Sequence, residues 1–235
     1  MKKSLLALVA GLIAVCANYT AQAAVVTVDG SQTWNGYMNV FSLTGSGGKG
    51  AYQFGSGWGL GDLKSTVTGN TVKLEPNVNT YVNAIAGNAA DRAYWTDGVG
   101  GGNKFMEANT FVEKAPGVLS GSLTFTGNVD SYSLASNYIL TAFIKGLNPG
   151  NGYADEIGQF AVINSGSSSF SVSADLTGKS NLIMQYGFMV SGINANPAQS
   201  GLGSAVVSPV PEPSIASLLG FGALGLIATR FRRRS

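Results

Sequence analysis

The stretch from Asp91 to Asp97 gathers side chains that could bind a polar ligand. Tyr94 and Trp95 are adjacent rings, and such rings can stack on the C–H faces of a sugar while polar neighbours bond to its hydroxyls. Asp91, Arg92 and Asp97 would supply those polar contacts. The pattern therefore predicts a glycan-binding platform on a long loop. The alternative is that both rings simply pack within that loop, because aromatic side chains are usually buried.

Catalytic chemistry has few residues to draw on. The chain has no His and a single Cys, Cys16, which excludes a Ser-His-Asp triad, a Cys-His pair and nearly every zinc, copper or non-haem iron site. Paired carboxylates remain. Glu107 and Glu113 share one expected strand and one face, about 20 Å apart, too far to act as a pair. We therefore predict that the protein is not an enzyme, with a carboxylate-dependent glycoside hydrolase as a distant alternative.

A structural calcium ion is the cofactor that the composition leaves open. Sandwich folds can hold calcium through loop carboxylates and carbonyls. Asp29 and Asp62 are the main candidates, with Asp91 and Asp97 as further ones. No Asp-x-Asp ladder is present, so ordinary turn and capping acids are the competing interpretation. We predict no required cofactor.

The elements that must position these residues follow a period of two. Apolar and hydroxyl residues alternate over 119–126 and 169–174, and apolar residues recur at every second position from Leu182 to Val190. Residues 66–74 read as a hairpin with a positive φ at Gly69, while 104–113 and 138–145 read as deeper strands. Trp34 and Trp58 are expected in the core. The sequence predicts an all-β fold for residues 24–207, an antiparallel jelly-roll-like β-sandwich, with a β-barrel or an immunoglobulin-like sandwich as alternatives.

The N-terminus has the three parts of a secretory signal. Met1-Lys2-Lys3 is a basic start, 5–16 is an apolar run, and Ala21-Gln22-Ala23 is a small-x-small cleavage site. We expect signal peptidase to cleave between Ala23 and Ala24, which makes 1–23 a signal peptide. Cys16 would leave with it, so the mature chain would carry no disulfide.

The C-terminus carries a second set of targeting features in 208–235. A polar patch, Val210-Pro211-Glu212-Pro213-Ser214, precedes an expected transmembrane helix over 215–229 and a basic tail over 230–235. Arg230, Arg232, Arg233 and Arg234 would hold the end of that helix on the cytoplasmic side. Fifteen residues at about 1.5 Å each span roughly 22 Å, short of a hydrocarbon core of about 30 Å. A transient anchor is therefore favoured over an ordinary permanent one.

These three C-terminal elements, in this order, resemble the PEP-CTERM sorting signal of Gram-negative bacteria. The resemblance implies processing by an exosortase near Pro211-Glu212-Pro213, through an intermediate anchored in the inner membrane. It also implies delivery to the cell surface or to an exopolysaccharide-rich matrix. Two shorter elements, Trp34-Asn-Gly-Tyr-Met-Asn-Val-Phe41 and Phe54-Gly-Ser-Gly-Trp-Gly-Leu-Gly-Asp-Leu63, resemble a domain that recurs in exported proteins with this tail. That domain would cover about 28–189, and it implies no activity.

Charge narrows the choice of partners. Residues 24–209 hold eight Lys and Arg against eleven Asp and Glu, a formal charge of −3, and the basic balance of the whole chain comes from its two ends. No basic surface is left to neutralise phosphates, so we expect no nucleic-acid partner. We predict a structural or interaction protein of the cell surface or extracellular matrix, associated with exopolysaccharide. A discrete carbohydrate-binding module is the main alternative.

Overall fold

The computed structural model describes residues 23–211. Ala21, Glu212, Pro213 and Ser214, the expected helix over 215–229 and the arginines from Arg230 to Arg234 all lie outside the described residues. Ala23, Ala24, Val210 and Pro211 lie within them. No helix between residues 23 and 211 combines the length and the apolar character needed to cross a membrane.

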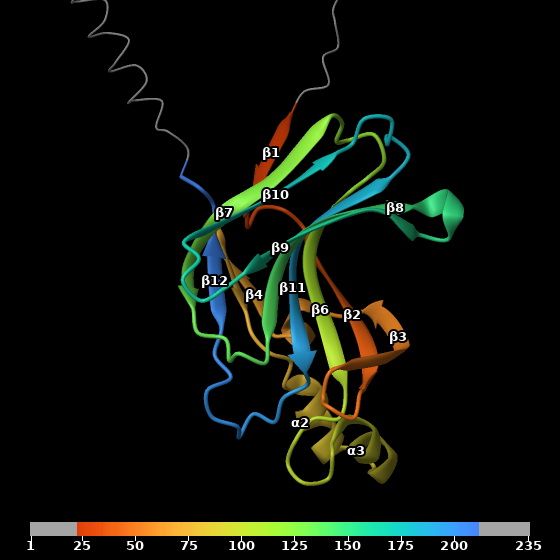
Figure 1. The fold of residues 1–235 in the computed structure, drawn as a ribbon, viewed down its shortest axis with the longest axis vertical. Coiled ribbons are helices and arrows are strands. Elements are labelled where there is room, and N and C mark those ends of the chain that lie inside the picture. Colours follow the sequence, from red (N-terminus) through yellow and green to blue (C-terminus); the bar gives the residue numbers. More distant parts are fainter. Residues whose placement is uncertain (1–22, 212–235) are drawn as a thin grey trace, which may run out of the picture.

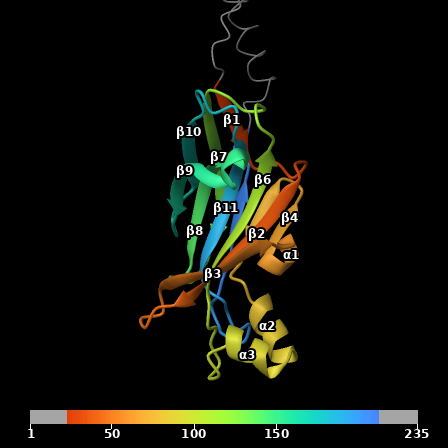
Figure 2. The ribbon, with the colours of Figure 1, turned by 90° about the vertical axis from the view of Figure 1, so that its right-hand side faces the viewer.

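Twelve strands form two six-stranded sheets in the described part of the chain (Figures 1 and 2). Sheet A contains β1 (Ala24–Thr27), β4 (Ser65–Thr68), β5 (Thr71–Leu74), β7 (Ser122–Tyr132), β10 (Ser169–Asp175) and β12 (Ala205–Ser208), in the order β1-β7-β12-β5-β4 with β10 on β7. Sheet B contains β2 (Trp34–Leu43), β3 (Lys49–Gly57), β6 (Phe105–Lys114), β8 (Ile139–Asn148), β9 (Ala154–Ile163) and β11 (Ile183–Ile193), in the order β3-β2-β6-β11-β8-β9. The predicted β-sandwich is confirmed, and its jelly-roll connectivity stays a prediction.

The antiparallel prediction fails for one strand pair, because β1 runs parallel to β7. β1 pairs with Leu123–Thr126, and β12 pairs with the following part of β7 up to Tyr132. The two short strands therefore share one edge of a long one. A parallel pair needs a long connection, and nearly a hundred residues separate β1 from β7 in the chain.

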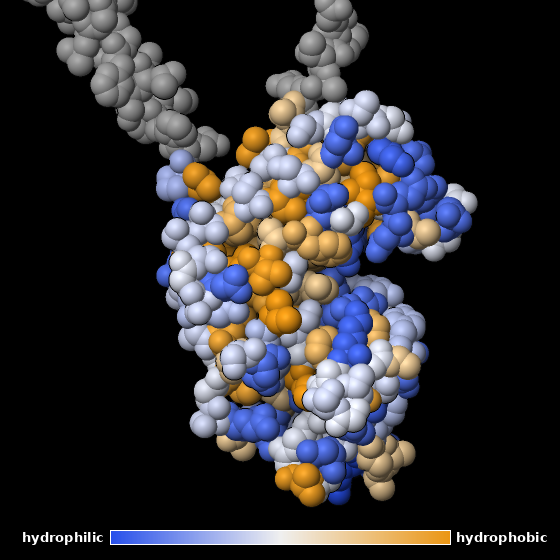
Figure 3. All heavy atoms as spheres, in the orientation of Figure 1, coloured by the Kyte–Doolittle hydropathy of each residue, from blue (hydrophilic) through white to orange (hydrophobic). Residues whose placement is uncertain are grey.

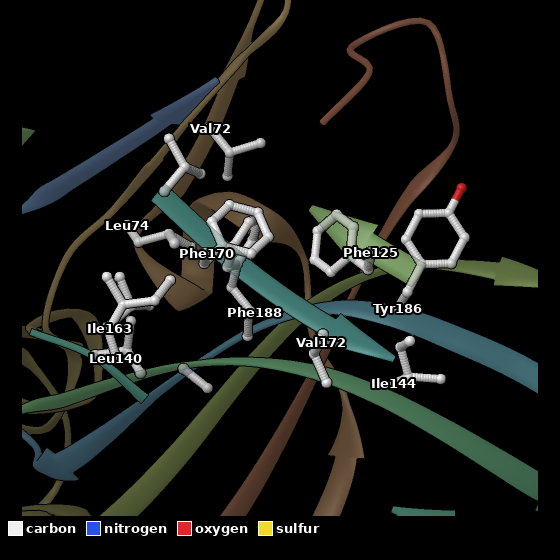
Figure 4. Close-up of a cluster of buried hydrophobic side chains, with 14 of the residues drawn as sticks. Val72, Leu74, Phe125, Leu140, Ile144, Ile163, Phe170, Val172, Tyr186 and Phe188 are labelled. Atoms are coloured by element: carbon white, nitrogen blue, oxygen red, sulfur yellow. The ribbon is translucent and has the colours of Figure 1, made fainter. Parts of the chain in front are cut away.

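The core lies between the two sheets and follows the alternation read from the sequence (Figure 4). On β10, Phe170, Val172 and Ala174 are buried while the serines between them are exposed. Phe125 of β7 is fully buried, and its ring lies 5.3 Å from that of Phe188 on β11. These contacts join sheet A to sheet B. The hairpin at Gly69 is also confirmed, with a φ of 54°.

The region expected to be a long loop is partly helical. α1 (Leu60–Leu63) follows β3, and α2 (Asn79–Ala86) and α3 (Ala89–Trp95) follow β5. Asn88 caps α3 by accepting the backbone N–H of Asp91 at 2.9 Å. α2 and α3 lie at one end of the sandwich, and the described chain begins and ends toward the opposite end (Figure 1). The predicted loop residues Tyr94 and Trp95 therefore sit on a helix.

Candidate functional site

A cavity of about 430 Å³ opens between the end of β3 and the helices. We call it the tryptophan cavity because two indole rings, Trp58 and Trp95, form part of its wall. Its lining comprises Gly57, Trp58, Gly59, Asp62, Asn79, Thr80, Asn83, Ala84, Asp91 and Trp95. Both rings are half-buried and pack against the edge of the core. Trp58 packs against the core, as the sequence predicted, and in addition it lines the cavity.

Close backbone packing holds Trp58 in place. A Cβ on Gly36 of β2 would lie 2.3 Å from the carbonyl oxygen of Trp58, so only glycine permits this approach. The indole Nε1–H of Trp58 donates to Ser56 Oγ at 2.7 Å. Its ring meets that of Trp95 at 6.4 Å between centroids and an interplanar angle of 67°. The two rings thus form a corner rather than a flat surface.

Asn194 attaches the helical part to the sandwich. It is 1% exposed and lies just past β11. Its Nδ2 donates to the carbonyl of Trp95 at 2.9 Å and to Thr80 Oγ1 at 3.1 Å. A Cβ on Gly102 would lie 1.7 Å from the Asn194 carbonyl oxygen. This buried network sets the position of α2 and α3, and with it the width of the cavity.

The structure separates the residues that the sequence grouped as a platform. Asp91 and Trp95 line the tryptophan cavity, but Tyr94, Arg92 and Asp97 do not. The Tyr94 ring stands at 81° to that of Trp95, and the Lys104 ammonium lies 4.1 Å above it. Desolvation by the surrounding protein raises the Tyr94 pKa.

Arg92 and Asp97 make local contacts instead. The Arg92 guanidinium donates to the carbonyl of Ile85 at 3.1 Å, at the end of α2. The Asp97 carboxylate accepts the backbone N–H groups of Gly101 and Val99, at 2.7 and 2.9 Å. These bonds, led by that of Gly101, lower the Asp97 pKa. Both residues therefore stabilise the turns that flank α3.

The two main calcium candidates lie in different surroundings. Asp62 lines the tryptophan cavity, whereas the Asp29 carboxylate accepts bonds from Ser31 and Gln32 in a turn. These bonds lower the Asp29 pKa, with the Gln32 side chain as the largest cause. Among residues 23–211, no three carboxylates lie close enough together to hold a metal ion. Calcium binding stays a prediction.

A larger hollow, about 700 Å³, crosses the outer face of sheet B. We call it the sheet-B groove. Figure 3 shows the surface hollowed at its right-hand edge, below the tip that joins β8 to β9. The groove is lined by Tyr37, Asn39, Asn109, Phe111, Glu113, Lys145, Leu147, Gly152, Tyr153, Asp155 and Gln185. Asn109 and Phe111 are only 3% and 6% exposed although they are not part of the core cluster between the sheets. Lys145 contacts Asn109, and Phe143 packs against Phe111.

Strand register brings the groove residues together. Tyr37 of β2 pairs with Asn109 of β6, while Glu113 of β6 pairs with Gln185 of β11. Gln185 Nε2 donates to Glu113 Oε2 at 2.8 Å. Gln185 in turn pairs with Lys145 of β8. Paired residues share a face of the sheet, so four strands place two cross-strand rows of side chains on the groove face, Tyr37–Asn109 and Glu113–Gln185–Lys145, four residues apart along β6.

Tyr153 is held over the groove by a strained backbone. Its φ is +62°, a left-handed conformation that costs a non-glycine residue roughly 1–2 kcal/mol. It follows the 3₁₀ turn η1 (Pro149–Asn151) and Gly152 at the tip of the β8–β9 hairpin. The side chain is 61% exposed. Strain of this kind gathers at ligand sites, and here it places an exposed tyrosine in the wall of the groove.

Lys145 brings a poorly solvated positive charge into the groove. Its Nζ lies 4.8 Å above the Phe143 ring and 3.4 Å from Asn109 Oδ1. Within residues 23–211 no carboxylate oxygen lies within 4.0 Å of it. The Lys145 pKa is lowered, and desolvation by burial is the largest cause. The negative charges of Asp155 and Glu107 act in the opposite direction and raise it. A ligand group that accepts hydrogen bonds from this ammonium would therefore stabilise its charged form.

Comparison with known proteins gives little further guidance. No family model matches the chain, and no curated protein matches it. Among solved structures, one from a study of the promiscuous specificity of carbohydrate-binding modules of the β-sandwich superfamily aligns with a TM-score of 0.35 and 14% identity. The alignment covers 76% of this chain and 55% of that one, so the chain spans about half the length of the matched structure.

Sequence reasoning missed the sheet-B groove entirely. One signal was present, because Tyr153 directly follows the turn sequence Asn148-Pro149-Gly150-Asn151-Gly152. An aromatic residue at the tip of such a turn is exposed unless something covers it. Asp155, the second residue of β9, lines the groove close to Tyr153 in the chain.

Proposed function

We propose that this protein is exported to the cell surface or extracellular matrix, where it binds polysaccharide without cleaving it. The observation that carries the proposal is the sheet-B groove. It combines open tyrosine rings with amide, carboxylate and ammonium groups in one hollow of about 700 Å³. Tyr37 is 38% exposed and Tyr153 is 61% exposed. A concave site with a few convergent polar groups and a perturbed pKa is the usual form of a ligand site.

The chemistry of the groove fits sugars better than apolar or nucleic-acid ligands. Asn39 and Gln185 offer both donors and acceptors, which match hydroxyl groups. The Asn109 amide is used within the protein, because it donates to the carbonyls of Tyr37 and Glu107 and accepts from Lys145. Glu113 and Asp155 accept, and Lys145 donates. Tyrosine rings cover the apolar face of a sugar while keeping a polar end in water. The groove is elongated across four strands rather than closed, so it favours an internal segment of a polymer over a small free ligand.

Export is proposed from the two ends of the chain. The C-terminal signal at Val210–Ser214 would be processed by an exosortase, and signal peptidase would remove 1–23. Val210 is 41% exposed where the chain leaves sheet A, and its backbone N–H donates to Thr27 Oγ1 at 3.3 Å. Asn128 Nδ2 donates to the carbonyl of the preceding Pro209 at 3.1 Å. The start of the motif is thus accessible at the surface, which supports proteolytic processing after the domain has folded.

Binding is tested by screening the purified secreted protein on a glycan array and measuring affinity for the glycans it retains. Tyr153→Ala should weaken binding about tenfold or more, which corresponds to about 1.4 kcal/mol. Tyr52→Ala is the matched control, because Tyr52 is 58% exposed on β3 and does not line the groove. Equal affinities for the two variants would reject the groove as the site.

Export is tested separately by intact mass of the protein recovered from the matrix of the native host. The proposed processing predicts loss of 1–23 and of the arginines Arg230 to Arg234. A mature chain that keeps those arginines would reject exosortase processing. This result would leave glycan binding by the groove unaffected, since the two proposals depend on different residues.

A further inference from the structure

We propose that the tryptophan cavity recognises an organic ammonium group, namely the free amino group of an amino-sugar residue in a polysaccharide. This inference rests on the proposed function only in that the ligand is a polysaccharide. The cavity shares no lining residue with the sheet-B groove. It is therefore a second site, with its own selectivity.

The charge of the cavity carries the first part of the argument. Asp62 and Asp91 both line it, and no Lys or Arg among residues 23–211 does. Neither carboxylate forms a salt bridge within residues 23–211, where the three ion pairs are Lys49–Glu107, Lys73–Glu75 and Lys179–Glu156. Asp91 accepts one bond from Asn88 Nδ2 at 2.8 Å, which is a neutral partner. Both negative charges are therefore uncompensated at the wall of a hollow, which favours a cationic ligand.

Three cations near the two carboxylates do not neutralise them. Lys64 lies two residues after Asp62 in the chain, but it does not line the cavity and forms no salt bridge within residues 23–211. Arg92 follows Asp91 directly, but its guanidinium donates to the carbonyl of Ile85. Lys104 lies over the Tyr94 ring, and its Nζ donates to the carbonyl of Asn103 at 3.2 Å. Burial lowers the Lys104 pKa. Arg92 and Lys104 therefore interact with other groups and do not pair with the carboxylates of the cavity.

The indole rings carry the second part. Trp is the aromatic side chain with the strongest attraction for a cation over its face. Trp58 and Trp95 pack edge to face at 67°, and both are in the wall of the cavity, so the wall combines two indole rings at an angle to each other. Carboxylates beside these rings add direct attraction for the same cation. This combination selects an ammonium group over a neutral hydroxyl or acetamido group.

The amide groups of the cavity suit the rest of a sugar ring. Asn79 Nδ2 donates to the carbonyl of Gly61 at 2.8 Å, and no group within residues 23–211 donates to its Oδ1. Asn83 is exposed on the next turn of α2. Amide oxygens accept bonds from sugar hydroxyls. Together with the two rings, these groups favour an amino sugar over a simple alkyl ammonium ion.

The test measures binding of the full secreted protein to three hexasaccharides built from glucosamine, N-acetylglucosamine and glucose. We expect the glucosamine hexasaccharide to bind at least tenfold more tightly than the other two. Asp62→Asn should reduce that preference at least threefold, because it removes one carboxylate and preserves the side-chain shape. Asp175→Asn is the matched control, since Asp175 is an exposed turn carboxylate outside both sites. It removes the same net charge and should leave the preference unchanged.

The outcomes separate this inference from the proposed function. Equal binding of the three hexasaccharides, lost in Tyr153→Ala, would overturn the inference and keep the groove. A glucosamine preference that Asp62→Asn does not change would also overturn it, because the ammonium would then be recognised elsewhere. Trp95→Phe serves as a second variant that keeps an aromatic ring in the wall, and it should weaken glucosamine binding selectively. Failure to bind any of the three sugars would overturn the inference, while the glycan array decides the proposed function separately.

Discussion

Replacing Lys145 with Met should make the protein more stable and a poorer binder of polysaccharide. The Lys145 ammonium lies between the Phe143 ring and Asn109, without a carboxylate within 4.0 Å in residues 23–211. Burial lowers its pKa, so the folded protein disfavours the charged form. Met preserves the packing of the aliphatic stem and removes the charge.

The contacts of Lys145 set the expected gain in stability and the expected loss of glycan affinity. The amide contact is long at 3.4 Å and the ring contact is weak, so they offset only part of the desolvation cost. Replacing a poorly paired buried charge by an apolar group is often stabilising. A gain of about 1 kcal/mol would raise Tm by about 2–4 °C in a domain of this size. Loss of a charge-assisted hydrogen bond to a ligand, about 1.5–3 kcal/mol, would weaken binding by roughly ten- to a hundredfold.

The pH dependence gives an independent check. The pKa of Lys145 is lower in the folded than in the unfolded state. At a pH between these two pKa values, the unfolded chain therefore binds more protons than the folded one. Wild-type stability should therefore rise with pH as it moves from the folded pKa toward the ordinary Lys value of about 10.5. The Tm advantage of Lys145→Met should be full below that window and should shrink within it.

Differential scanning calorimetry and a glycan titration measure the two effects in parallel. Lys73→Met is the control, because Lys73 is exposed, is paired with Glu75 and lies on β5 of sheet A, away from Lys145. Its loss should change stability by less than about 1 kcal/mol and should not raise it. A lower Tm for Lys145→Met would show that the ammonium stabilises the fold. Unchanged glycan affinity would show that Lys145 does not contact the ligand, and either result refutes the reasoning.

Two further variants test the fold around the sites. Phe125→Ala should lower the free energy of unfolding by about 3–5 kcal/mol, measured by chemical denaturation, because the ring is fully buried between the sheets. Phe160→Ala removes an exposed ring and should lower it far less. Gly102→Ala should loosen α2 and α3, since its Cβ would overlap the Asn194 carbonyl, and hydrogen exchange should then speed up in both helices. Gly61→Ala is its control, as an added Cβ there meets open space; similar exchange in the two variants would contradict the assigned role of Asn194.

The strands were predictable because the alternation of apolar and polar residues within each one shows which side chains are buried. The alternation of Phe170, Val172 and Ala174 with serines is local, and sheet pairing did not alter it. The positive φ of Gly69 was equally local, since a two-residue turn requires it. The sandwich followed from the number of such segments and the absence of long helices.

The helices were missed because non-local contacts form them. No residue of α3 is fully buried, so its sequence shows no apolar stripe. Its position depends on Asn194, which lies 99 residues from Trp95 in the chain. The sheet-B groove was missed for a related reason. A period of two tells which residues face outward, but it does not tell which strands become neighbours.

The placement of the two sites bears on whether the protein is structural or a discrete binding module. Tyr37, which lines the sheet-B groove, is the register partner of Gly57, which lines the tryptophan cavity. The two sites therefore meet across the β2–β3 ladder. A polysaccharide long enough to occupy both would gain from the high effective concentration of its second contact, whereas a short oligosaccharide would fill one site only. If the protein binds long polysaccharides more tightly than short ones, this one surface would both recognise the glycan and hold the protein in a matrix.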